Sequence, residues 1–102
     1  MSYRILRTDK ASDQLYDIIQ YIAAVSSVDT ALGYLDKLES AIMNLADFPL
    51  SGTIPRYSTL KKQGYRVLIV ERHLVFYKVD KKAKIVMIHA IVDGRQEYRD
   101  LI

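Results

Sequence analysis

The chain has 102 residues, of which 50% are hydrophobic and 26% charged. This balance is typical of one folded domain, and the length is too short for two. Cysteine is missing from the sequence, which excludes disulfides, thiolate metal sites and cysteine nucleophiles. No apolar run approaches the ~20 residues of a membrane span, and residues 1–10 lack the apolar stretch of a signal peptide. We therefore expect a single cytoplasmic domain that covers residues 1–102.

The net charge of +3 conceals an asymmetry between the two halves of the chain. Residues 1–55 hold four Lys and Arg against seven Asp and Glu, a balance of −3. Residues 56–102 hold eleven against five, a balance of +6. The basic half is where an anionic partner would dock, although charge alone does not choose between nucleic acid and an acidic protein.

The first half of the chain predicts a strand followed by a helix. Residues Tyr3 to Arg7 are short and rich in strand formers, so we expect a β-strand that ends before Asp9. Asp9 can cap the helix that follows. From Ala11 to Val25 the apolar residues recur at spacings of three and four, which predicts an amphipathic helix that stops near Ser26.

A second helix follows after a short connection. Asp29 or Thr30 can cap it, and the same apolar stripe runs from Ala31 to Leu45 and ends before Pro49. Two helices joined by so few residues should form an antiparallel hairpin.

Residues 49–64 contain Gly52 and Pro55 among several Ser and Thr. Turn chemistry rather than periodicity should set this backbone, so we expect a long loop. Loops of more than ~12–15 residues in a compact domain are usually functional or mobile.

The remainder predicts three strands, at residues 65–71, 74–80 and 85–92. Their tight connections require antiparallel pairing. The last strand is apolar on both faces except for His89, as expected of a central strand, and a polar turn or short helix follows Asp93. The predicted order is β-α-α-β-β-β, an α+β domain with a helical hairpin packed on one face of an antiparallel sheet.

The familiar signatures of phosphate-binding loops and metal sites do not occur in the sequence, so we expect neither a metal nor a cofactor. His73 falls at a predicted turn, where a solvated residue is the simplest interpretation. His89 falls in the apolar strand, where a hydrogen-bonded core histidine is the simplest interpretation.

A set of cations gathers around the predicted sheet. It comprises Lys61 and Lys62 at the end of the loop, Arg66 in the second strand, and Arg95 with Tyr98 just after the last strand. Arginines so placed could hold phosphates bidentately, and the tyrosine could stack on a base or pass a proton. A solvated basic rim explains the same residues equally well.

Several segments, in order, resemble the RelE/ParE toxin superfamily. They are the stripe from Ala11 to Ile22, Pro49 with Gly52, Gly64-Tyr65-Arg66-Val67-Leu68, the run from Leu74 to Asp80, and Gly94-Arg95-Gln96-Glu97-Tyr98. The resemblance covers nearly the whole chain, and it implies the α+β fold described above. It also implies a small cytoplasmic toxin of a type II toxin-antitoxin system, neutralised by a co-expressed antitoxin.

The superfamily divides by mechanism. RelE-like members cut mRNA in the ribosomal A site, whereas ParE-like members poison DNA gyrase without a nuclease site. Arg66, Arg95 and Tyr98 resemble the RelE catalytic set, with Lys61 and Lys62 as the RNA-binding lysines. The long helical hairpin and the run from Tyr65 to Asp80 resemble ParE at least as well.

In metal-free RNA cleavage, each of these residues would have a distinct chemical role. Arg66 and Arg95 could stabilise charge on the phosphorane, but arginine is a poor base. Tyr98 or a lysine would then serve as acid or base, which requires cationic neighbours or desolvation at neutral pH. The resemblance to the RelE catalytic set slightly favours a ribosome-dependent mRNA endoribonuclease. The alternatives are a non-enzymatic gyrase inhibitor and an inactive protein that only binds antitoxin.

Overall fold

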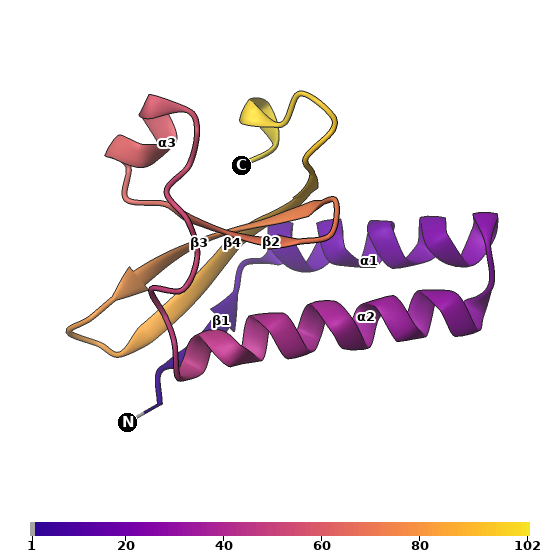
Figure 1. The fold of residues 1–102 in the computed structure, drawn as a ribbon, viewed down its shortest axis with the longest axis horizontal. Coiled ribbons are helices and arrows are strands. Elements are labelled where there is room, and N and C mark those ends of the chain that lie inside the picture. Colours follow the sequence, from indigo (N-terminus) through magenta and orange to yellow (C-terminus); the bar gives the residue numbers. More distant parts are fainter. Residues whose placement is uncertain (1) are drawn as a thin grey trace.

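The computed structural model describes residues 2–102. Figure 1 shows the elements, which in chain order are β1 (Arg4–Arg7), α1 (Asp9–Val25), α2 (Val28–Met43), η1 (Asn44–Ala46), α3 (Ser58–Lys62), β2 (Arg66–Val70), β3 (His73–Asp80), β4 (Ile85–Asp93) and η2 (Arg99–Leu101). The predicted α+β class and the order of its main helices and strands are confirmed. The structure adds a short helix, α3, and two 3₁₀ turns.

The two long helices begin two and three residues earlier than their apolar stripes suggest. Thr8 caps α1 and Ser27 caps α2, because each hydroxyl accepts a hydrogen bond from the backbone N–H three residues on, at 3.1 and 3.0 Å. Asp9 and Asp29, which the sequence offered as caps, lie instead in the first turns. There their negative charge still favours the positive end of the helix dipole.

The sheet has the strand order β1-β4-β3-β2. β4 is a central strand, as its apolar sequence predicted. β2, β3 and β4 pair antiparallel, but β1 pairs parallel to β4, so the sheet is mixed rather than wholly antiparallel. The connection between the strands explains this pairing. The helical hairpin follows β1 in the sequence, and the chain then returns to the sheet at the opposite edge, through β2.

Each face of the sheet has its own apolar core. The helical hairpin covers one face, whereas α3 and the C-terminal segment lie over the other (Figure 1). We call the first the hairpin-side core; its buried members include Leu15, Leu38, Leu45, Val75, Tyr77, Val86, Ile88 and Ile91. We call the second the α3-side core; it comprises Leu60, Tyr65, Val67, Phe76, Ala90, Val92 and Tyr98.

The segment at 49–64 is more ordered than the sequence predicted. Thr53 exchanges two backbone hydrogen bonds with Val67 of β2, at 2.8 and 2.9 Å. Residues 58–62 form α3, anchored by the buried side chain of Leu60. A single apolar anchor in a five-residue helix leaves no periodic pattern, so turn residues alone could not predict it.

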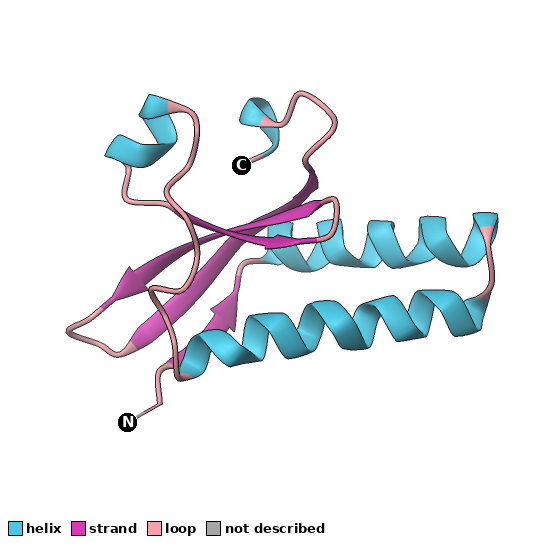
Figure 2. Cartoon of the chain, in the orientation of Figure 1, coloured by secondary structure: helices cyan, strands magenta, loops and turns pink. Residues whose placement is uncertain are grey.

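The far end of the helical hairpin extends beyond the sheet, as Figure 2 shows. Its side chains there include exposed apolar residues at Val25, Val28 and Leu32. Within residues 2–102, none of the helices has the length and apolar character that crossing a membrane requires.

Candidate functional site

Arg66 and Tyr98, two of the residues that the sequence selected, lie on opposite faces of the sheet. Arg66 begins β2 opposite Tyr77 and alternates with Leu68 and Val70, which pack in or against the hairpin-side core. Because every second side chain of a strand points to the same face, Arg66 belongs to the hairpin side. Tyr98 is buried in the α3-side core. The sheet therefore separates these two side chains.

The other selected residues divide in the same way. Lys61 and Lys62 are exposed in the last turn of α3, on the side of the sheet that holds Tyr98. Arg95 follows β4, and its guanidinium donates to both carboxylate oxygens of Asp93, at 3.1 and 2.9 Å. The structure thus brings the two lysines to the side of Tyr98, leaves Arg66 behind the sheet, and gives Arg95 a counter-ion.

A different set of residues lines a groove beside the helical hairpin. A groove of about 590 Å³ runs between α1 and the ends of β3 and β4, and a smaller depression of about 280 Å³ adjoins it under α2. Ile22, Arg72 and His73 line both. We call the two together the hairpin groove; its other lining residues include Ile18, Tyr21, Tyr34 and Arg95.

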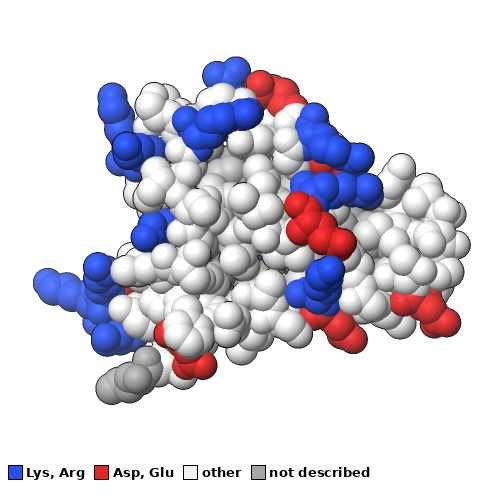
Figure 3. All heavy atoms as spheres, viewed as in Figure 1, with Lys and Arg blue, Asp and Glu red and all other residues white. Residues whose placement is uncertain are grey.

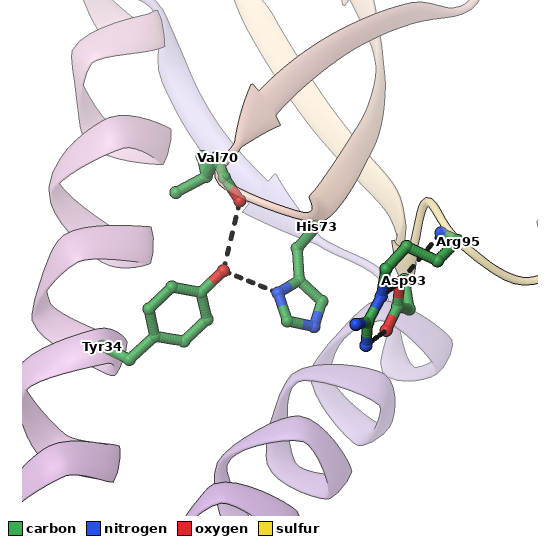
Figure 4. Close-up of polar contacts among 5 residues, drawn as sticks. All are labelled: Tyr34, Val70, His73, Asp93 and Arg95. Carbon is green, nitrogen blue, oxygen red and sulfur yellow. Dashed lines mark hydrogen bonds and ion pairs between the residues drawn. The ribbon is translucent and has the colours of Figure 1, made fainter.

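His73 lies at the junction of the two parts of the groove, and it is only 4% exposed. The expectation of a solvated turn residue was therefore wrong. Tyr34 of α2 covers the ring: its hydroxyl lies 2.6 Å from Nδ1 of His73 and donates to the carbonyl of Val70 at 3.1 Å (Figure 4). Since a hydroxyl has one hydrogen, donation to Val70 makes Tyr34 the acceptor of an Nδ1–H.

Burial also changes the acid–base properties of this pair. Desolvation lowers the pKa of His73 and raises the pKa of Tyr34, because each charged form loses water. Both side chains are therefore held in their neutral forms near neutral pH. A hydrogen-bonded neutral pair of this kind fixes α2 against the β2–β3 turn.

Asp93 is the cross-strand partner of His73, and with Arg95 it lies on the far side of the histidine ring from Tyr34 (Figure 4). The hydrogen bonds from the Arg95 side chain lower the pKa of Asp93 to about 2. The pair is therefore ionised across the physiological range. Arg72 lies beside it in the groove and forms no ion pair within residues 2–102.

Gln14 closes the inner end of the groove. Its Oε1 accepts from the backbone N–H of Ile91 at 2.8 Å, and its Nε2 donates to the carbonyl of Leu101 at 2.9 Å. One side chain thus joins α1, β4 and the C-terminal turn. No local sequence pattern reveals such contacts with residues far along the chain.

Comparison with known families identifies the chain. The family described as the ParE toxin of the type II toxin-antitoxin system parDE matches residues 5–98. The chain belongs to the ParE toxin family. The match runs from β1 to Tyr98, so it includes both α-helices of the hairpin and every strand of the sheet.

Solved structures share the fold of this ParE family member. The chromosomal ParDE toxin-antitoxin system of P. aeruginosa superposes with a TM-score of 0.74 at 18% identity, over 90% of this chain and 96% of that one. The RelBE2 toxin-antitoxin complex of Mycobacterium tuberculosis superposes with a TM-score of 0.62 at 20% identity, over 91% and 92%. No curated protein sequence matches the chain.

His89, the second histidine of this ParE family member, lies at a β-bulge. Tyr77 pairs with Ile88 and Phe76 with Ala90, which leaves His89 without a cross-strand partner in β3. The extra residue turns its ring toward the edge of Tyr65, with centroids 5.3 Å apart. His89 is half-buried at this position. Desolvation, aided by Lys78 and Lys10, lowers its pKa.

Several polar side chains of the hairpin groove are already paired with one another. Nδ1 of His73 is hydrogen-bonded to the hydroxyl of Tyr34, and the guanidinium of Arg95 is hydrogen-bonded to the carboxylate of Asp93. Among residues 2–102, no cluster of three or more His, Asp or Glu could hold a metal ion. What remains open is apolar surface on α1, including Tyr21 at 61% exposure, with Arg72 beside it. Such a surface suits an amphipathic protein segment.

Proposed function

We propose that this ParE family toxin acts by binding DNA gyrase and blocking its reaction, without cleaving RNA, and that a cognate antitoxin neutralises it in the cytoplasm. The observation that carries the proposal is the separation of Arg66 from Tyr98 by the sheet. A phosphodiester between them would have to contact both faces at once. General acid–base catalysis needs its groups within about 3 Å of the same reacting atoms.

Two further features support a binding mode of action. Tyr98 packs edge-on against Tyr57, with centroids 5.5 Å apart, and is 5% exposed, so little of its surface can meet a substrate. Arg95 is already paired with Asp93. Ribosome-dependent mRNA cleavage, the activity that the sequence slightly favoured, would need both side chains to rearrange. The family match to ParE points the same way.

In this proposal, the antitoxin binds in the hairpin groove. The two similar structures are of the chromosomal ParDE toxin-antitoxin system and the RelBE2 toxin-antitoxin complex. In the present chain, apolar side chains of α1 and the cation Arg72 line the groove. An antitoxin segment that presents apolar residues with an acidic residue beside them would be complementary in shape and charge. The basic balance of residues 56–102 favours an acidic partner generally.

The direct test is a supercoiling assay with purified gyrase and the full chain. We expect the toxin to inhibit supercoiling of relaxed plasmid, and the co-expressed antitoxin to restore it when added in excess. Arg66→Ala, Arg95→Ala and Tyr98→Phe serve as variants of the predicted catalytic set. Unimpaired supercoiling in the presence of saturating toxin would contradict the proposal.

A further inference from the structure

A line of lysines runs along the side of the molecule away from the hairpin groove. It begins with Lys61 and Lys62 in the last turn of α3, continues to Lys78 on β3, and ends with Lys81 and Lys82 in the β3–β4 turn. We call these five residues the lysine track. Figure 3 shows Lys and Arg side chains projecting at the left of the view, both over α3 and over the β3–β4 turn.

A backbone hydrogen bond, a cation–π contact and a depression connect the two ends of the track. The backbone N–H of Tyr65 bonds to the carbonyl of Leu60 at 3.2 Å, which holds the end of α3 against the start of β2. The ammonium of Lys78 then lies 4.5 Å from the ring centroid of Tyr65. Beyond Lys78, a shallow depression reaches Lys81 and Lys82. The lysines therefore follow one continuous surface.

The charge of the track is not balanced by neighbouring acids. Four ion pairs form within residues 2–102, and their cations are Arg7, Lys37, Arg95 and Arg99. None of the five track lysines takes part. Asp80 is the acid that lines the depression, and one of its carboxylate oxygens already accepts from the N–H of Ala83 at 2.9 Å. The ammonium groups of the track are therefore not neutralised by ion pairs within residues 2–102.

We propose that the lysine track binds the phosphate backbone of duplex DNA. Lysine is a compact point charge that contacts phosphates without reading base edges. The surface offers no platform on which the bases of a single strand could stack, because Tyr65 is 9% exposed and Lys78 lies over its ring. In duplex DNA the bases already stack on each other, so its regularly charged backbone is the ligand that this chemistry recognises.

The lysine track and the hairpin groove differ in kind. The groove mixes cations, acids and apolar side chains, which suits a protein segment. The track consists of five lysines, and Asp80 is the acid in the depression beside Lys78, Lys81 and Lys82. The DNA contact therefore goes beyond the proposed inhibition of gyrase, and it is measured without gyrase. Failure of one proposal leaves the other intact.

The test measures binding of the purified full chain to a labelled duplex DNA by fluorescence anisotropy, at about 50 and 200 mM salt. Lys81→Gln combined with Lys82→Gln removes two track charges. Arg7→Gln combined with Lys37→Gln lowers the net charge from +3 to the same +1, but at paired residues away from the track.

We expect the track variant to bind duplex DNA about ten- to a hundredfold more weakly at low salt, with a salt slope shallower by about 0.9 for each lysine removed. The matched variant should retain most of the affinity. Equal losses in the two variants would overturn the proposal, as would the lack of salt-dependent binding by the wild type. Tighter binding of single-stranded RNA of the same length, or of poly-glutamate, would overturn the assignment to duplex DNA.

Discussion

The hydroxyl of Tyr34 and Nδ1 of His73 lie 2.6 Å apart, and this contact joins the helical hairpin to the turn between β2 and β3. The same hydroxyl donates to the carbonyl of Val70. Tyr34 therefore contacts two polar groups of the β2–β3 turn with a single hydroxyl. The contact sets the shape of the hairpin groove, because both side chains line it.

Tyr34→Phe should lower the free energy of unfolding by about 1–3 kcal/mol, because it leaves Nδ1 of His73 and the Val70 carbonyl without their partner. Urea denaturation followed by circular dichroism measures the change. Tyr16→Phe is the matched control, since Tyr16 is 63% exposed and contacts only Gln20 through its hydroxyl. Equal stability of the two variants would show that the bridge contributes nothing.

Stability should fall as the pH drops below about 6.5, the ordinary pKa of histidine. Burial lowers the pKa of both His73 and His89 in the folded state. The unfolded chain therefore binds protons that the folded chain does not. The contribution of the two neutral histidines to the free energy of unfolding is complete above pH 6.5 and is lost as the pH falls below it. Asp93 does not contribute to this loss of stability near pH 5, because its pKa in the folded state is about 2.

The measurement is the urea midpoint at several pH values between about 7 and 5. His89→Gln should reduce the slope and keep the fold, because His89 is half-buried at a bulge. A wild-type protein that gains stability as the pH falls through this range would contradict the burial argument.

Gly52→Ala should be strongly destabilising. An added Cβ would lie 2.5 Å from the hydroxyl oxygen of Tyr77 and 2.7 Å from the carbonyl oxygen of Val67. It would also disturb the hydrogen bond that the Gly52 N–H donates to the hydroxyl of buried Tyr77. We expect a loss of about 1–3 kcal/mol, the usual range for overpacking a core.

Gly33→Ala is the opposite case within the same chain. Gly33 lies inside α2, and a Cβ there meets nothing within 4 Å. Alanine should therefore stabilise the protein by up to about 1 kcal/mol. Thermal denaturation of the two variants side by side should give melting temperatures that move in opposite directions.

The proposed binding of the antitoxin in the hairpin groove can be tested with substitutions on α1. Tyr21 and Tyr16 are both on α1 and are 61% and 63% exposed, but only Tyr21 lines the groove. Tyr21→Ser should weaken the complex with the co-expressed antitoxin at least tenfold, as truncation of a buried aromatic anchor does (about 2 kcal/mol). Calorimetric titration should show unchanged affinity for Tyr16→Ser. Unchanged affinity of both variants would place the antitoxin elsewhere.

Periodicity predicted the parts of the fold that depend on repeated burial. The two helices and the three antiparallel strands followed from the spacing of their apolar residues. The parallel pairing of β1 with β4 did not, because a short strand carries no information about its partner. Nor did α3, which depends on Leu60 alone.

The candidate site was harder to predict than the fold. The sequence grouped Arg66 with Tyr98 by chemistry, but the face on which Arg66 lies depends on its register with Tyr77. It assigned His73 to solvent, because a turn residue gives no sign that Tyr34, in a helix distant in sequence, covers it. A search for buried polar pairs between the hairpin and the sheet would have needed the tertiary structure.

The central claim is that the toxin arrests growth without cutting RNA. The most direct measurement is to induce the full chain briefly in cells and to map the 5′ ends of a reporter mRNA by primer extension, beside Tyr98→Phe. We expect intact mRNA, growth arrest by both proteins and accumulation of broken chromosomal DNA. Codon-phased cuts that vanish in Tyr98→Phe would contradict the account and identify a ribosome-dependent endoribonuclease.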